Sequence, residues 1–137
     1  MQLTSHIVCA LSVLLVATGC HNDTTPAATT PTAARTTETF TGTVAVGGAD
    51  SHTFTITAAG DVDVTLTAAT PSVVMGLDVG MPGTGTCVAV AGGSTQASAG
   101  SSVQLSGVAS PGTMCVDVHD AGGQSAPVTY TVTVTHP

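Results

Sequence analysis

The stretch TFTITAAGDVDVTLTA, residues 53–68, alternates apolar and polar side chains with a period of two on both sides of a short turn. The alternating apolar residues are Phe54, Ile56 and Ala58 before the turn, and Val62, Val64, Leu66 and Ala68 after it. Successive side chains of a β-strand point to opposite faces, so each run predicts a strand with one buried face. The intervening threonines are β-branched and polar, which suits the solvent-facing side of a strand.

The same alternation recurs toward the end of the chain. There the predicted buried face consists of Val128, Tyr130, Val132 and Val134. Weaker strand patterns cover residues 40–46, 75–81, 86–91, 102–107 and 113–119, and Gly, Pro and Asp turn signals separate them. Eight short strands without a helical period predict an all-β domain, an antiparallel β-sandwich, over residues 38–137.

The N-terminal residues have the pattern of an export signal. Residues 7–17, IVCALSVLLVA, form a short apolar run, and small residues lead from it to Cys20. This ending resembles the lipobox of bacterial lipoproteins, which implies a signal peptide over residues 1–19 and a lipid on Cys20. Cys9 would then leave with the signal peptide. An ordinary signal peptide and a short membrane anchor are the alternatives.

Residues 20–37 have the composition of a tether. Thr, Pro and Ala dominate this segment, and it contains no large apolar side chain that could support a folded core. With a lipid on Cys20, such a tether predicts a domain held at the membrane of the cell envelope, outside the cytoplasm. In a host with two membranes, the presence of His21 rather than Asp after Cys20 favours the outer membrane.

The domain after the tether carries acidic side chains and no Lys or Arg. Its carboxylates belong to Glu38, Asp50, Asp61, Asp63, Asp78, Asp117 and Asp120, and the only Lys or Arg of the chain is Arg35, in the tether. Nucleic acids and anionic lipid headgroups are therefore poor partners for the domain, since phosphate binding needs basic side chains. For the same reason we expect no salt bridge to stabilise the domain. Its carboxylates would be solvated, cap turns, pair with a His or bind a metal ion.

The remaining cysteines, Cys87 and Cys115, predict a disulfide, because the export signal places them in an oxidising compartment. Free, metal-binding thiols are the alternative. Alternation puts each cysteine on the strand face opposite its apolar neighbours, which are Val88 and Val90 in one strand and Met114, Val116 and Val118 in the other. The two strands are thus predicted to be neighbours joined on an outer sheet surface, with Val88 and Val90 turned toward the core.

Two runs of sequence resemble one known family. They are FTGTVAVGGADSHTFTITAAGDVDVTLTA, residues 40–68, and APVTYTVTVTH, residues 126–136. Both are similar to the opening and closing strands of the bacterial pre-peptidase C-terminal domain. The resemblance implies a jelly-roll-like sandwich that serves as a non-catalytic accessory of exported proteins.

The sequence offers little support for catalysis. No Gly-x-Ser-x-Gly elbow accompanies the histidines of the domain, His52, His119 and His136, as a serine hydrolase would require. The glycines of residues 80–85 lack the spacing of a phosphate-binding loop. We therefore predict that the chain is not an enzyme.

A calcium site is the stronger candidate for specific chemistry. Asp61 and Asp63 lie two residues apart on one strand face, and Asp117 and Asp120 flank His119 at the end of another strand. Calcium takes six to eight oxygen ligands, which these carboxylates and loop carbonyls could supply. The alternative is that Asp beside Gly only forms turns.

The predicted function is a non-catalytic, lipid-anchored extracytoplasmic module, which binds another exported protein or forms part of the envelope surface, with no cofactor. The alternative is a ligand-binding module on the cell surface, with calcium or a glycan as the ligand. A glycan is the less favoured ligand, because the chain has no Trp and because Phe40, Phe54 and Tyr130 all fall on predicted core faces.

Overall fold

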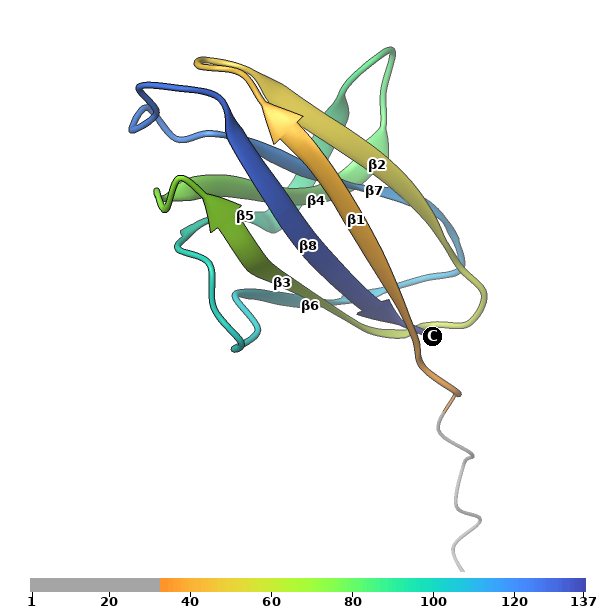
Figure 1. The fold of residues 1–137 in the computed structure, drawn as a ribbon. Coiled ribbons are helices and arrows are strands. Elements are labelled where there is room, and N and C mark those ends of the chain that lie inside the picture. The colour runs from red at the N-terminus through yellow and green to blue at the C-terminus, as the bar shows by residue number, and fades with distance from the viewer. Residues whose placement is uncertain (1–32) are drawn as a thin grey trace, which may run out of the picture. The chain divides into compact units, whose positions relative to one another are not determined.

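The computed structural model describes residues 33–137, and Figure 1 shows them as two stacked β-sheets. The strands are β1 (Thr36–Val44), β2 (Ala49–Ile56), β3 (Gly60–Thr70), β4 (Met75–Pro82), β5 (Cys87–Ala97), β6 (Leu105–Ala109), β7 (Gly112–Asp120) and β8 (Val128–His136). No helix occurs between residues 33 and 137, so this part of the chain has no helical membrane span. The prediction of an all-β sandwich with about eight strands is confirmed.

The strand order of the two sheets shows how the chain is wound. One sheet has the order β1-β8-β3-β6 and the other β2-β7-β4-β5, and all neighbouring strands are antiparallel. Each strand of the first half pairs with its counterpart from the other end of the chain: β1 with β8, β2 with β7, β3 with β6 and β4 with β5. This is the winding of a jelly roll. It places β2 and β3 in opposite sheets although they follow one another in sequence.

The core between the sheets consists of the alternating apolar residues. Val128, Tyr130, Val132 and Val134 of β8 are at most 3% exposed, as predicted, and Phe54 and Ile56 of β2 are buried as well. Val62, Val64 and Leu66 of β3 belong to the same core, as do apolar residues of β4 and β7. A fully buried Val or Leu side chain contributes roughly 1.5–3 kcal/mol to folding, so β2, β3 and β8 carry much of the stability.

The predicted alternation fails at one position of β3. The register between β3 and β8 shifts between Leu66 and Ala68, which marks a β-bulge. Because the extra residue reverses the faces that follow it, Ala68 is exposed and Ala69 packs against the core instead. The prediction that Ala68 is buried is therefore wrong.

The expectation that no salt bridge stabilises the domain is also wrong. β1 begins at Thr36, two residues before the predicted domain boundary, and this brings Arg35 onto the fold. The Arg35 guanidinium lies 2.7 Å from the Asp63 carboxylate and donates to the backbone carbonyls of Asp61 and Thr135. As a partly exposed pair it contributes at most about 1 kcal/mol.

The Asp63 carboxylate is therefore held by hydrogen bonds within the fold. A hydrogen bond from the Ser106 hydroxyl and the Arg35 guanidinium beside it lower the pKa of the Asp63 carboxyl. Since the folded pKa lies below the unfolded one, this stabilisation is fully present above a pH of about 4 and is lost as the pH falls through the folded pKa.

Candidate functional site

Polar side chains from three strands meet on the outer face of the β2-β7-β4-β5 sheet. The apolar residues of β7 point into the core, and alternation turns Cys115, Asp117 and His119 to the outer face, as predicted. β4 places Asp78 directly opposite Asp117, and Ser51 reaches Asp117 from β2. We call Asp78, Asp117 and His119 the Asp–His cluster.

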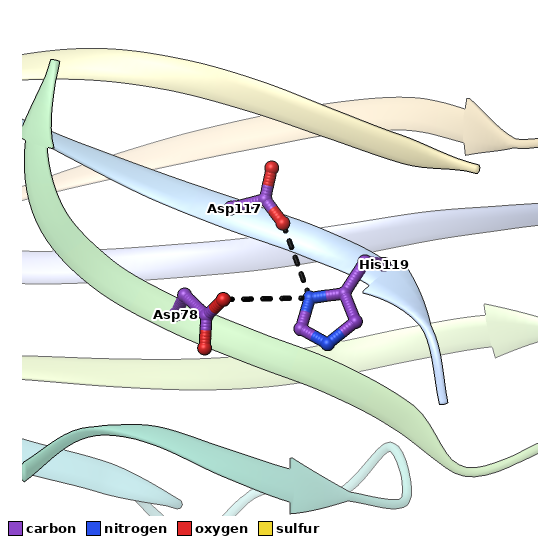
Figure 2. A group of neighbouring side chains, drawn as sticks. All are labelled: Asp78, Asp117 and His119. Carbon is purple, nitrogen blue, oxygen red and sulfur yellow. Dashed lines mark hydrogen bonds and ion pairs between the residues drawn. The ribbon is translucent and has the colours of Figure 1, made fainter. Parts of the chain in front are cut away.

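The Asp–His cluster is compact. Figure 2 shows the Nδ1 atom of His119 facing both carboxylates, 3.1 Å from Asp117 Oδ2 and 3.7 Å from Asp78 Oδ2. One possible ligand atom from each of the three residues lies within 4.8 Å of the others. The Asp117 side chain is only 10% exposed, whereas that of His119 is 33% exposed. The cluster is thus buried where Asp117 lies and open to solvent where His119 lies.

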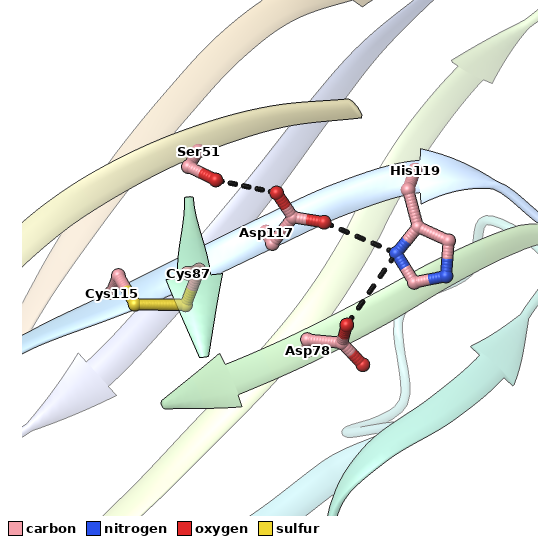
Figure 3. The surroundings of a disulfide bond; sticks show 6 residues. All are labelled: Ser51, Asp78, Cys87, Cys115, Asp117 and His119. Carbon is pink, nitrogen blue, oxygen red and sulfur yellow. Dashed lines mark hydrogen bonds and ion pairs between the residues drawn. A yellow bond between two sulfur atoms is a disulfide. The ribbon is translucent and has the colours of Figure 1, made fainter. Parts of the chain in front are cut away.

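Two neighbours orient the Asp–His cluster. The Ser51 hydroxyl donates to Asp117 Oδ1, which leaves Oδ2 facing His119 (Figure 3). Gly76 lies opposite His119 across the β4–β7 ladder, and a Cβ atom at this position would lie 1.9 Å from His119 Nε2. The imidazole therefore packs directly over the Gly76 backbone, and a larger residue at position 76 would displace it.

Of the four carboxylates predicted to bind calcium, only Asp117 belongs to this cluster. Asp63 is held by Arg35 and Ser106, and Asp61 is an exposed residue on β3, in the other sheet. The structure therefore separates the two pairs, Asp61 with Asp63 on β3 and Asp117 with Asp120 on β7.

Asp120 organises two turns. Its carboxylate accepts hydrogen bonds from backbone N–H groups of the β1–β2 and β7–β8 connections, namely those of Gly47, Gly122 and Gln124. These bonds, that from Gly47 foremost, lower the pKa of the Asp120 carboxyl. Asp120 therefore matches the alternative to a calcium ligand, which is that an Asp beside Gly forms turns.

Asp78 was missing from the predicted ligands. The signal available in the sequence was its position in the 75–81 strand pattern, where alternation turns it away from Leu77 and Val79 toward solvent. Nothing in that pattern says that β4 lies beside β7. The pairing of Asp78 with Asp117 is a property of the sheet order alone.

The structure joins Cys87 and Cys115 in a disulfide on the outer face of the sheet, as predicted, with the two Cα atoms 5.7 Å apart (Figure 3). The two strands are, however, separated by β4 in the sheet order, so the prediction that they are neighbours is wrong. Contact is possible because the start of β5 passes over β4 at Gly80, where a Cβ atom would lie 1.9 Å from the Val88 carbonyl oxygen.

This crossing also corrects the predicted faces of β5. Val88 is 58% exposed and Val90 is 42% exposed. The prediction that both side chains face the core is therefore wrong. The β4–β5 ladder pairs Cys87, Val88 and Ala89 with Pro82, Met81 and Gly80 and resumes only at Ser94, so residues 90–93 have no partner in β4. Alternation identified which residues share a face, but not which face is buried.

A groove lies beside the disulfide. It is lined by Ala49, Asp50, Ser51, Thr53, Pro82, Gly83, Gly85, Thr86, Cys87, Cys115 and Asp117. None of the three aromatic residues of the chain lines this groove, since Phe54 and Tyr130 are buried and Phe40 is partly buried against the core. The groove therefore provides no aromatic platform for a sugar ring.

The side of the sandwich between β1 and β2 is closed by side chains. Phe40 stacks on His52 with ring centroids 4.9 Å apart, and the Tyr130 hydroxyl lies 2.7 Å from His52 Nε2 and donates to Asp50. Burial, with the Asp50 carboxylate nearby, raises the pKa of Tyr130. Gly42 has no room for a side chain above this network.

The opposite side, between β5 and β6, is open. Both are edge strands, and an apolar cleft of about 270 Å³ lies between them. It reaches inward to the core side chains of Val62, Val79 and Met114, and Val90, Leu105 and Val108 are among the residues at its mouth. Val108 of β6 is 80% exposed. This is the largest exposure among the bulky apolar side chains of residues 33–137.

The sequence comparisons assign no relative. The chain matches no protein-family model, and no curated protein matches it.

Proposed function

We propose that the chain is a lipid-anchored, non-catalytic module of the cell envelope that binds an extended segment of another exported protein. The observation that carries this proposal is the apolar cleft between β5 and β6, beside which Val108 is 80% exposed. An exposed apolar groove that opens onto the core is typical of an interaction site.

The strand β6 is suited to pair with a further strand. It pairs only with β3, so the backbone N–H and C=O groups of its other edge are not used in the sheet. Its sequence, Leu105–Ala109, contains none of the Lys, Pro or bulge features that protect edge strands from pairing. A partner strand added here would gain backbone hydrogen bonds, and its alternate side chains could enter the cleft.

The chemistry of the cleft indicates the kind of segment it would accept. The residues that line it are apolar or small, and none carries a charge. An extended peptide with alternating Val, Ile, Leu or Phe side chains would therefore fit without burying an unpaired charge. The resemblance of residues 40–68 and 126–136 to an accessory domain of exported proteins supports the same role.

The anchoring part of the proposal rests on residues that lie outside the described part of the chain. These are the signal peptide over residues 1–19, the lipid on Cys20 and the tether up to residue 32. The apolar run of residues 7–17, which ends at small residues before Cys20, supports lipid attachment.

A photo-crosslinking amino acid in place of Val108 tests the binding surface. We expect irradiation of cells to join position 108 to one exported protein, because the Val108 side chain would lie against a bound strand. The matched control is the same substitution at Val46, a valine that is 55% exposed in the β1–β2 turn. Purified partner should then bind V108E roughly tenfold or more weakly than V46E, as expected for an interface anchor.

Equal crosslinking at positions 108 and 46, or equal affinity of V108E and V46E, would contradict the proposed surface. An adduct at position 108 that contains only a second copy of this chain would also contradict it, since the cleft would then serve self-association.

The substitution Cys20→Ser tests the anchor. We expect the wild-type chain to fractionate with membranes and to carry the mass of a lipid, whereas the C20S chain loses both properties because the thiol that accepts the lipid is absent. Mass spectrometry and detergent phase partitioning measure the change, with Cys9→Ser as the control that keeps the anchor. A C20S chain that still partitions into detergent would rule out lipid attachment at this residue.

A further inference from the structure

We propose that Asp78, Asp117 and His119 bind one divalent transition-metal ion, represented by Zn²⁺, on the outer face of β4 and β7. This site lies in the β2-β7-β4-β5 sheet and is independent of the protein-binding cleft proposed above.

The geometry brings three metal-binding side chains to one point. His119 Nδ1 lies 3.1 Å from Asp117 Oδ2 and 3.7 Å from Asp78 Oδ2, and the three ligand atoms lie within 4.8 Å of one another. Zinc binds imidazole nitrogen and carboxylate oxygen at about 2.0–2.2 Å. Figure 2 shows both carboxylates directed toward His119 Nδ1, so an ion placed among the three ligand atoms could contact all of them.

The ligand types select the metal. Calcium and magnesium prefer oxygen ligands, and calcium takes six to eight of them. An imidazole with two carboxylates instead suits Zn²⁺ and its neighbours in the transition series. The side chain of His119 is 33% exposed, so positions around the ion would remain open to water or to a ligand from another molecule.

The charge of the surroundings favours a cation at this point. Asp78 and Asp117 lie directly opposite each other across the β4–β7 ladder, an arrangement that destabilises a sheet when both are ionised. The chain has one Lys or Arg, and that residue, Arg35, is bound to Asp63 in the other sheet. Among residues 33–137, His119 is the only basic side chain in ionic contact with the two carboxylates, and a divalent ion would offset both charges.

The supporting residues hold the ligands in place before an ion arrives. The Ser51 hydroxyl donates to the Asp117 oxygen that does not face His119, an outer hydrogen bond of the kind that orients metal ligands. Gly76 lets the imidazole approach the β4 backbone closely, where a Cβ atom would lie 1.9 Å from His119 Nε2. Neither Ser51 nor Gly76 is a proposed ligand, so they can hold Asp117 and His119 in place without occupying a position on the ion.

Isothermal titration of Zn²⁺ into the full chain tests the site. The protein is purified without a His tag, with its disulfide intact, and is stripped with EDTA. We expect one ion per cluster, and we expect Asp78→Asn, Asp117→Asn and His119→Gln each to weaken binding roughly tenfold or more, since each replaces a carboxylate or imidazole ligand with a neutral amide. The matched control is Asp61→Asn, an exposed carboxylate of the other sheet, which should bind as the wild type does.

A second readout keeps the test valid if a cluster variant folds poorly. Zn²⁺ should raise the unfolding temperature of the wild type and of D61N, and should raise that of H119Q clearly less at the same zinc concentration, because the stabilisation of the native state falls as binding weakens. Zinc binding that is equal in H119Q and D61N, no zinc binding by the wild type, or tighter binding of Ca²⁺ than of Zn²⁺ would overturn the proposal.

Discussion

Replacing both Cys87 and Cys115 with serine is expected to lower the free energy of unfolding by about 3–4 kcal/mol in the chain-entropy model. The disulfide closes a sequence separation of 28 residues, and its removal lets the unfolded chain sample conformations that the cross-link forbids. In a domain of this size such a loss would lower the unfolding temperature on the order of 20 °C.

The location of the disulfide adds a local effect to this global one. The first residues of β5 pair only with the end of β4, with Val88 exposed, and the Cys87–Cys115 bond ties them across β4 to β7. Without the bond few apolar contacts hold this segment, so hydrogen exchange of residues 87–90 should rise before the rest of the domain unfolds. The core lies on the other face of the sheet and should keep its structure.

Thermal unfolding followed by circular dichroism measures the loss, and reduction of the wild type with dithiothreitol is the control. The reduced wild type should unfold within a few degrees of the double serine variant, and both should keep a folded β-spectrum at 25 °C. Recovery of two free thiols from the oxidised exported protein, or an unchanged unfolding temperature, would show that the bond does not stabilise the domain.

The substitution Gly80→Ala is expected to destabilise the fold by about 2–3 kcal/mol, a large effect for the addition of one methyl group. A Cβ atom at position 80 would lie 1.9 Å from the Val88 carbonyl oxygen and 2.8 Å from the Ala89 Cα atom. These are backbone atoms of the crossing segment, which Cys87 holds in place, so they cannot rotate away as a side chain could.

The control for this prediction is Gly107→Ala. Gly107 lies in the middle of β6, and nothing within 4 Å would meet a Cβ atom there. Its substitution should leave stability unchanged or raise it by up to about 1 kcal/mol, because alanine restricts the unfolded chain. Denaturant unfolding of both variants measures the difference, and equal stability of G80A and G107A would mean that β5 does not cross β4 at this point.

The sequence allowed the fold class to be predicted because strand alternation is a local property. Val62, Val64 and Leu66, like the alternating residues of β8, reveal their shared face through spacing alone. The same spacing predicted that Cys115 and His119 lie on the outer face of β7. Where a bulge adds a residue, as between Leu66 and Ala68, the local pattern fails because nothing in it marks the shift.

The candidate site could be predicted only in part, since strand neighbours are decided by packing between residues far apart in sequence. Asp117 and His119 lie two residues apart on one strand, so their spacing alone predicts that they share a face. Asp78 joins them only because the jelly-roll winding lays β4 against β7. Arg35 likewise contacts Asp63 because β1 begins at Thr36, within the segment whose composition predicted a tether.

By itself, then, the sequence determined the all-β class, the shared faces within regular stretches of strand and the pairing of Cys87 with Cys115, which follow from local periodicity and from the presence of two cysteines in the domain. Only the tertiary structure decided that Val88 and Val90 face solvent, that β4 separates the bridged strands and that Asp78 completes a cluster. A period of two assigns side chains to one of two faces. Which face is buried, and which strands lie side by side, depends on the contacts that the whole chain makes when its sheets pack together.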